Sequence, residues 1–205
     1  MGRQFALPLS PVSGNPPRIV VGNANEDVVE AFAHADSWPF HTAILVGPPR
    51  SGKSLLARWF VEGGFGDALD NADALDEAEV FHRWNRAQET GRGLLIVSNV
   101  GSPCASEGEG WHIALPDLAS RLGAALPLVI EEPDDAMTAD LIALHAEVRG
   151  LMIDDSATAY LVARCERSHL GVEQLVAAID RLSLERKQAP TMAIWRDALA
   201  ETGRD

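Results

Sequence analysis

The sequence predicts an α/β fold, in which a parallel sheet forms a three-layer α/β/α arrangement and an all-helical part follows. Up to about residue 132, short apolar runs alternate with amphipathic segments, a pattern typical of a parallel sheet with crossover helices. From Pro133 onward only helical periodicity is present. The 205 residues suffice for one such domain with a smaller one attached. We therefore expect a Pro-rich tether at 1–17, a sheet domain at 18–132 and a helical lid at 133–205.

In the sheet domain, strands and helices are expected to alternate with short connections. The continuous apolar run Ala43–Val46 predicts a buried strand, and Gly91 is expected to end an amphipathic helix. Strands are expected at 18–21, 41–47, 93–100 and 126–132, with a short one inside 66–73, and the run at 126–132 is expected to be buried. Helices are expected around Val28 to Phe32 and at 55–64, 76–91 and 116–124.

The helical part has clear start and stop signals. One helix is expected from about Asp135 to Arg149, where Gly150 ends it, and another follows the acidic cap at 154–155. A third helix carries apolar residues at helical spacing, and the last begins at Thr191.

Charge and cysteine content narrow the possible functions. A net charge of −13 argues against a general affinity for nucleic-acid phosphates, which requires clustered Lys and Arg. The seven carboxylates from Glu62 to Glu79 indicate a solvated acidic face. Two cysteines without a CxxC partner indicate reduced thiols. No apolar run suits a secretion signal or a spanning helix, so we expect a cytoplasmic protein.

The segment GPPRSGKS at 47–54 fits the phosphate-binding loop G-x-x-x-x-G-K-[ST]. Glycine lets the backbone approach phosphate, the amides at the helix N-terminus point at the anion, and lysine balances its charge. An apolar strand precedes the segment and a helix follows, which favours a nucleotide site over a chance glycine-rich turn. The residues expected to contact nucleotide here are Gly47, Pro48, Arg50, Ser51, Gly52, Lys53, Ser54 and Leu55.

A nucleotide site of this kind needs Mg²⁺, for which the Ser54 hydroxyl and the Asp70 carboxylate are the expected ligands. Asp70 follows the short strand in GDALDNAD, and the alternative is that residues 67–73 are only an acidic loop. Hydrolytic enzymes of this class place a carboxylate beside such an Asp to orient water. Here Asn71 stands next to it and cannot accept a proton, so intrinsic ATP hydrolysis is expected to be weak or absent.

Together, GPPRSGKS, LDNAD, GLLIVSN, LPDLASRL and the helical lid resemble the AAA+ family of the bacterial replication initiator DnaA, and more closely its Hda-type regulators. The resemblance covers roughly residues 18–200. It implies a P-loop AAA+ module with ADP or ATP and Mg²⁺ as ligands. It also implies that Asn99 is a sensor near the γ-phosphate and that Arg121 is an arginine finger, which acts in trans on a nucleotide bound to a neighbouring subunit.

The chain also departs from the family pattern. Only fifteen residues separate Ser54 from Asp70, where the family fits another helix and strand, so the sheet is expected to be one strand short. At the lid position of the second sensor arginine the best alignment gives Glu173, although Arg167 could compensate. These differences fit a protein that holds nucleotide as a structural ligand.

The N-terminal sequence QFALPL is similar to the clamp-binding motif of Hda-type proteins. The expected contacts with the DNA polymerase sliding clamp are Gln4, Phe5, Leu7, Pro8 and Leu9. The alternative is a strand that packs into the domain. The proline-rich tether keeps the peptide extended, which suits insertion into a pocket.

The resemblance implies a regulator that docks on the clamp, presents Arg121 to ATP-bound DnaA and so lowers replication initiation. No DNA-binding domain and no membrane segment are expected, and a homodimer is possible. The alternatives are another DnaA-like AAA+ adaptor or loader that does not bind the clamp, and a freestanding P-loop ATPase or kinase. Brisk ATP turnover by the protein alone would favour the last of these.

Overall fold

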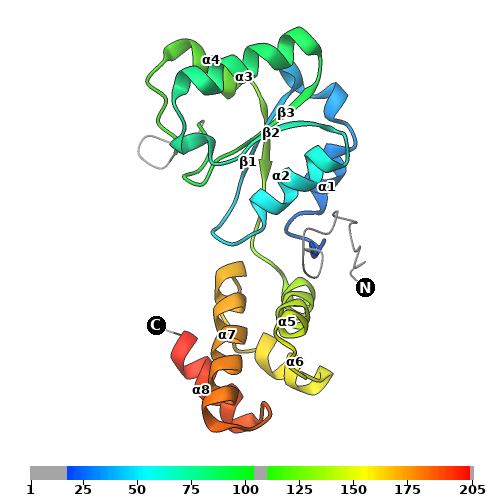
Figure 1. Ribbon diagram of the computed structural model, residues 1–205, viewed down its shortest axis with the longest axis vertical. Coiled ribbons are helices and arrows are strands. Elements are labelled where there is room, and N and C mark those ends of the chain that lie inside the picture. The colour runs from blue at the N-terminus through cyan, green and yellow to red at the C-terminus, as the bar shows by residue number, and fades with distance from the viewer. Residues whose placement is uncertain (1–17, 104–109, 204–205) are drawn as a thin grey trace. The chain divides into compact units, whose positions relative to one another are not determined.

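The computed structural model describes residues 18–103 and 110–203, which form two compact units (Figure 1). One unit is Asn25–Glu131, and the other joins the residues before Asn25 to Glu132 and the residues after it. The first contains the sheet and the second is helical.

In the sheet unit, the described residues form four parallel strands in the order β2-β3-β1-β4. Their bounds are Thr42–Val46 (β1), Gly66–Leu69 (β2), Gly93–Val97 (β3) and Leu126–Val129 (β4). Both central strands are buried along their whole length, as expected for parallel strands covered on both faces. The predicted α/β fold is therefore confirmed.

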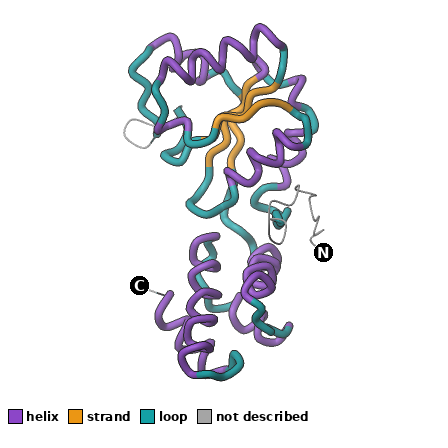
Figure 2. Tube along the Cα trace, in the orientation of Figure 1, coloured by secondary structure: helices purple, strands orange, loops and turns teal. Residues whose placement is uncertain are grey.

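Helices cover both faces of this sheet, which gives the expected three layers (Figures 1 and 2). On one side α1 (Glu26–Phe32) and α2 (Lys53–Glu62) pack through an aromatic cluster in which the Trp38 and Phe60 rings stack at 5.3 Å. On the other side α3 (Glu77–Thr90) and α4 (Pro116–Gly123) bury Val80, Trp84, Leu118 and Leu122 against the sheet. Short 3₁₀ segments at Ala35–Ser37, Pro39–His41 and Ala72–Ala74 complete the unit.

The short spacing between the phosphate loop and Asp70 leaves no room for an extra strand. Helix α2 ends at Glu62 and β2 begins at Gly66, so within the described part of the chain β2 is an edge strand that pairs with β3 alone. Gly66 lies opposite Gly93 in this pairing. The sheet thus keeps its central strands paired, as the sequence predicted.

Two predicted strands differ from the observed structure. The run at 126–132 was expected to be buried, but β4 is an edge strand in which Pro127 and Val129 are exposed. A proline lacks the N–H that a further strand on that edge would need. Residues 18–21 form no strand, although Ile19 and Val20 are buried.

Residues 18–24 instead belong to the helical unit, although the sequence-based boundary placed them with the sheet. The Arg18 guanidinium pairs with the Glu147 carboxylate at 2.8 Å. The Asn23 side chain accepts from the Asp134 N–H at 3.0 Å and donates to the Glu132 carbonyl at 3.3 Å. These polar links connect the segment to the start and end of the first lid helix.

The helical unit contains α5 (Asp135–Arg149), α6 (Asp155–Val162), α7 (His169–Arg186) and α8 (Met192–Thr202). The predicted caps are present: the Asp134 and Asp154 side chains accept from backbone N–H groups in the first turns of α5 and α6, and Gly150 ends α5 with a φ of 69°. The starts of α5 and α6 and the end of α5 are therefore set by local capping residues.

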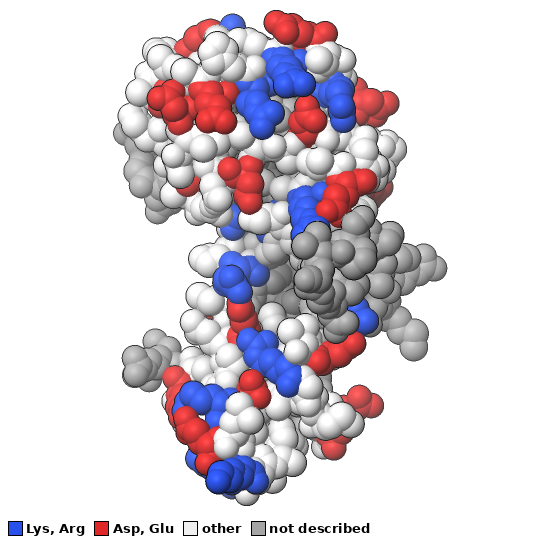
Figure 3. Space-filling model, in the orientation of Figure 1, with Lys and Arg blue, Asp and Glu red and all other residues white. Residues whose placement is uncertain are grey.

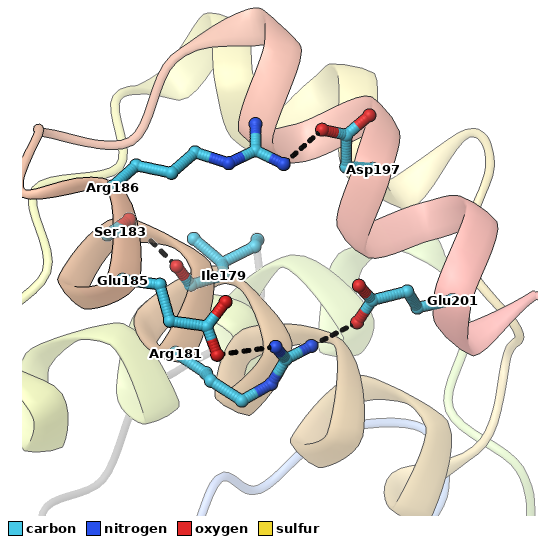
Figure 4. Close-up of polar contacts among 7 residues, drawn as sticks. All are labelled: Ile179, Arg181, Ser183, Glu185, Arg186, Asp197 and Glu201. Carbon is cyan, nitrogen blue, oxygen red and sulfur yellow. Dashed lines mark hydrogen bonds and ion pairs between the residues drawn. The ribbon is translucent and has the colours of Figure 1, made fainter.

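Charged pairs join α7 to α8 on the surface of this unit (Figure 4). Arg186 contacts Asp197 at 2.6 Å, while Arg181 contacts both Glu185 and Glu201. All these side chains are well exposed, so solvent screens each pair and the pair adds little to stability. Burial of Leu182, Ile194 and Ala198 therefore contributes more to helix packing.

On the face drawn in Figure 3, acidic and basic side chains are interspersed. None of the helices in the described ranges has the length and the apolar run needed to cross a bilayer.

Candidate functional site

The phosphate-binding loop connects the buried strand β1 to helix α2, which begins at Lys53. Gly52 caps the helix with a φ of 87°, and Arg50 also has a positive φ, of 63°. A side chain on Gly52 would be strained, although nothing lies within 4 Å of the position of its Cβ. At Gly47 a Cβ would lie 2.8 Å from the Ile130 Cβ, so close packing excludes any other residue. The local structure thus explains why glycine occupies positions 47 and 52.

Lys53 is buried inside this loop. Its ammonium donates to the carbonyl of Gly47 at 2.9 Å and to that of Pro48 at 3.0 Å. Burial lowers the pKa of Lys53, and the carboxylates of Asp70 and Asp73 oppose this shift. A buried ammonium that lacks a full counter-charge is stabilised by an incoming anion.

Other groups of the loop also fit a phosphate. The Ser51 hydroxyl is buried, and no hydrogen-bond partner for it is present among the described residues. A buried unsatisfied hydroxyl costs free energy that a ligand oxygen would recover. Ser54 lies exposed in the first turn of α2, where the helix N-terminus favours negative charge. The residues present therefore fit the β- and γ-phosphates of a nucleotide.

Asp70 follows β2 at the carboxyl edge of the sheet, as the sequence predicted, and its side chain is exposed. No group of three or more His, Cys, Asp or Glu side chains that could hold a metal ion occurs in the described ranges. Mg²⁺ in phosphate sites needs only one or two protein oxygens, because phosphates and water complete its octahedron. The oxygens of Ser54 and Asp70 are of the kind that this ion prefers.

Asn99 follows β3 and is tied to the residues after β2. Its side-chain amide donates to the Asn71 side chain at 2.6 Å, and its backbone N–H donates to the Asp73 carboxylate at 2.8 Å. Asn71 has a left-handed backbone with a φ of 51°, a conformation that asparagine tolerates. At the carboxyl ends of β2 and β3 lie three predicted residues: Asn99, the predicted sensor, Asp70, the predicted metal ligand, and Asn71 beside it. The participation of Asp73 was not predicted.

Arg121 lies in the last turn of α4 and packs against α3. Its guanidinium lies 4.6 Å from the ring centre of Phe81 and 4.5 Å from that of Trp84. One terminal nitrogen donates to the Asn85 side chain at 2.9 Å, and the other pairs with Asp117 at 3.0 Å. The side chain keeps 30% of its surface exposed. Arg121 is therefore held in place and remains reachable.

The fold separates Arg121 from the phosphate loop of its own chain. The loop follows the carboxyl end of β1, whereas α4 leads through two residues into the amino end of β4. Since β1 and β4 run parallel, the end of α4 and the loop lie at opposite ends of a strand about 15 Å long. Arg121 thus lies away from the phosphate loop of its own chain.

The remaining predicted residues belong to the N-terminal segment and to the helical unit. The candidate clamp-binding residues 4–9 lie outside the described part of the chain. Glu173 lies in the second turn of α7, and Arg167 pairs with Asp135 at 2.8 Å, both within the helical unit. Sequence reasoning missed Asn85 and its aromatic neighbours, although the predicted helix face at 80–84 was a usable signal.

The architecture and the loop define the class of fold: this is the α/β fold of AAA+ domains. Solved structures of DnaA are among those to which this fold is similar. Domain III of the Thermotoga maritima replication initiation protein DnaA superposes with a TM-score of 0.70 at 13% identity, covering 91% of this chain and 95% of that one. A replication initiator DnaA bound to AMPPCP and single-stranded DNA gives 0.60 at 16% identity, covering 82% of this chain and 66% of that one.

The Thermotoga maritima RuvB Holliday junction branch migration motor gives a TM-score of 0.57 at 12% identity, covering 87% of this chain and 68% of that one. No family model matches the sequence. An uncharacterized protein of Haemophilus influenzae is 27% identical over 135 residues, which is 65% of this chain and 56% of the relative. The matched region thus spans about half the length of that curated relative. At these identities the solved structures establish the fold.

Proposed function

We propose that this chain is a nucleotide-binding AAA+ regulator that docks on the DNA polymerase sliding clamp and promotes hydrolysis of ATP bound to DnaA. It would thereby lower the frequency of replication initiation. The observation that carries the proposal is the position of Arg121 in α4. Its side chain packs against α3, at the opposite end of β1 from the phosphate loop of the same chain. An arginine placed in this way suits a nucleotide on another molecule.

In this proposal ADP or ATP binds to the chain's own loop as a structural ligand. Lys53 and the helix N-terminus would balance the phosphate charge, while Ser51 would donate its hydroxyl. Mg²⁺, held by Ser54 and Asp70, would neutralise part of the phosphate charge. Asn71 cannot take a proton from water, and its side-chain oxygen already accepts a hydrogen bond from the Asn99 side chain. Both features support slow intrinsic hydrolysis.

The contribution to DnaA would be electrostatic. A guanidinium supplied in trans stabilises the charge that develops on the transferring phosphoryl group, an effect of about 10³–10⁵ in rate for known arginine fingers. The Arg121 guanidinium presents planar N–H donors, which suit phosphate oxygens. The candidate peptide at 4–9 would bring the chain to the clamp and so raise the local concentration of Arg121 near its target.

Single-turnover hydrolysis of DnaA-bound ATP tests this function. Purified DnaA carrying labelled ATP is mixed with clamp loaded on DNA and with this protein, as wild type or as Arg121→Ala. We expect the wild type to accelerate hydrolysis by at least a hundredfold and the variant to give no acceleration. Arg86→Ala, an exposed arginine on α3, is the matched control. Equal stimulation by Arg121→Ala and wild type would refute the finger assignment.

A further inference from the structure

We propose that Phe40 is an apolar anchor that docks the nucleotide-bearing partner beside Arg121, an inference that rests on the proposed function. Phe40 lies in the 3₁₀ segment Pro39–His41, which leads directly into β1 at Thr42. Its side chain is 54% exposed, although it is a large aromatic ring. Single exposed apolar residues are common on protein surfaces, so the backbone and the neighbours of Phe40 must decide its role.

The backbone at Phe40 is strained. Phe40 and the next residue, His41, have φ values of 50° and 49°, in the left-handed region that is costly for residues with a bulky side chain. The Nδ1 atom of His41 is also buried, and it has no hydrogen-bond partner among the described residues. These costs to the free chain fall in one short segment, and strain of this kind concentrates at sites that bind a ligand or a partner.

Hydrogen bonds hold the strained segment in place. The Gln88 side-chain amide, from α3, donates to the Phe40 carbonyl at 2.5 Å, and the Thr42 hydroxyl donates to the same carbonyl at 2.9 Å. The His41 N–H donates to the Trp38 carbonyl at 2.9 Å. Because these contacts fix the backbone before any partner arrives, the Phe40 ring loses less freedom when it binds.

Phe40 and Arg121 share one neighbour, the buried indole of Trp84. The Phe40 ring centre lies 6.4 Å from that of Trp84, and the central carbon of the Arg121 guanidinium lies 4.5 Å from the Trp84 ring. Both residues also lie at the amino end of the parallel strands, since Phe40 precedes β1 and Arg121 precedes β4. A partner that receives Arg121 at its nucleotide would therefore meet the Phe40 ring in the same contact.

The pairing of a cation with an exposed ring defines the surface that would fit it. The Arg121 guanidinium suits phosphate oxygens, and the Phe40 ring suits an apolar cavity beside that nucleotide. Aromatic residues and arginine are enriched at protein interfaces, where a few buried residues supply most of the affinity. The occupant is accordingly the AAA+ domain that carries the nucleotide, with Phe40 supplying docking affinity and Arg121 supplying charge.

The variant Phe40→Gly separates docking from folding. Glycine adopts a φ of 50° without strain, so the Tm should change little, because relief of the backbone offsets the lost ring contact. The affinity for ATP-loaded DnaA, measured by surface plasmon resonance without the clamp, should fall about tenfold. His41→Gly relieves the neighbouring strain and keeps the ring, so it is the matched control and should bind as wild type does. Val61→Ala, at another exposed apolar position of this unit, should also bind as wild type does.

A photo-crosslink gives a second readout that does not depend on how Phe40→Gly folds. The amino acid p-benzoylphenylalanine at position 40 keeps an aromatic ring and should crosslink to ATP-loaded DnaA, whereas the same probe at position 61 should not. If Phe40→Gly binds as wild type does, or position 40 gives no crosslink, while Arg121→Ala still abolishes stimulation, the anchor is wrong and the proposed function stands. If wild type gives no stimulation in the single-turnover assay, or Arg121→Ala matches it, the proposed function fails and the anchor fails with it.

Discussion

Replacing Gly66 by alanine should detach the edge strand β2 from the sheet. A Cβ at this position would lie 2.2 Å from the Gly93 carbonyl oxygen and 2.7 Å from the Phe60 ring. An ordinary carbon–oxygen contact is about 3.3 Å, so the strands would have to separate by about 1 Å. That shift stretches a 2.9 Å hydrogen bond beyond its useful length. Among the described strands β2 pairs with β3 alone, so no second strand holds it in place.

The expected cost follows from what β2 contributes. Each ladder hydrogen bond that is lost costs about 1 kcal/mol, and partial exposure of buried Leu69 costs up to about 2 kcal/mol. We therefore expect Gly66→Ala to lower the free energy of unfolding by about 3 kcal/mol. The matched control is Gly91→Ala. Gly91 has a φ of 66° and nothing within 4 Å of its Cβ position, so only the backbone strain of about 1 kcal/mol applies.

Urea unfolding followed by tryptophan fluorescence measures this difference, because Trp38 stacks on Phe60 beside the affected strand. Gly66→Ala should also lose the rise in Tm that ADP with Mg²⁺ gives to wild type, because Asp70 follows β2 directly. If the two glycine variants differ by less than about 0.5 kcal/mol, the close approach of β2 and β3 does not limit this position and the reasoning fails.

Further predictions concern the loop, the lid and the N-terminus. Lys53→Ala should abolish the ADP-dependent rise in Tm, and Arg58→Ala on the same helix should keep it; equal rises would exclude Lys53 as the phosphate contact. Asp134→Ala removes the α5 cap, so urea unfolding should show a loss of about 1 kcal/mol, and no change would mean that the cap does not stabilise the helix. Leu7→Ala with Leu9→Ala should lose clamp binding in surface plasmon resonance without a change in Tm, whereas a large drop in Tm would favour the packed-strand alternative.

Much of the fold was predictable because its signals are local. The apolar run Ala43–Val46 is fully buried as predicted, since both faces of a central parallel strand are covered. Gly91 and Gly150 end helices in left-handed conformations that glycine adopts without cost. The phosphate loop was also predictable from the sequence, because phosphate binding requires fixed residue types at fixed spacing.

The errors arose where the outcome depends on distant segments. Residues 18–21 have a strand-like composition, but Arg18 and Asn23 find their partners more than a hundred residues later, at Glu147 and Asp134. The strand at Leu126–Val129 has the apolar content of a buried strand, and its place at the sheet edge leaves it half exposed. Composition does not encode which strand lies at an edge, since this depends on the order of all the strands.

The sequence by itself determined the α/β architecture, the phosphate loop and the candidate residue Asp70, while its resemblance to the DnaA family implied Asn99 and Arg121. Only the tertiary structure decided how those residues are held. The Asn99 side chain is hydrogen-bonded to Asn71. Arg121, in α4, packs against α3 and lies away from the chain's own phosphate loop. The physical reason is that glycines, caps and apolar runs act over a few neighbouring residues, whereas the direction of a charged side chain depends on whichever aromatic ring or amide the fold brings beside it.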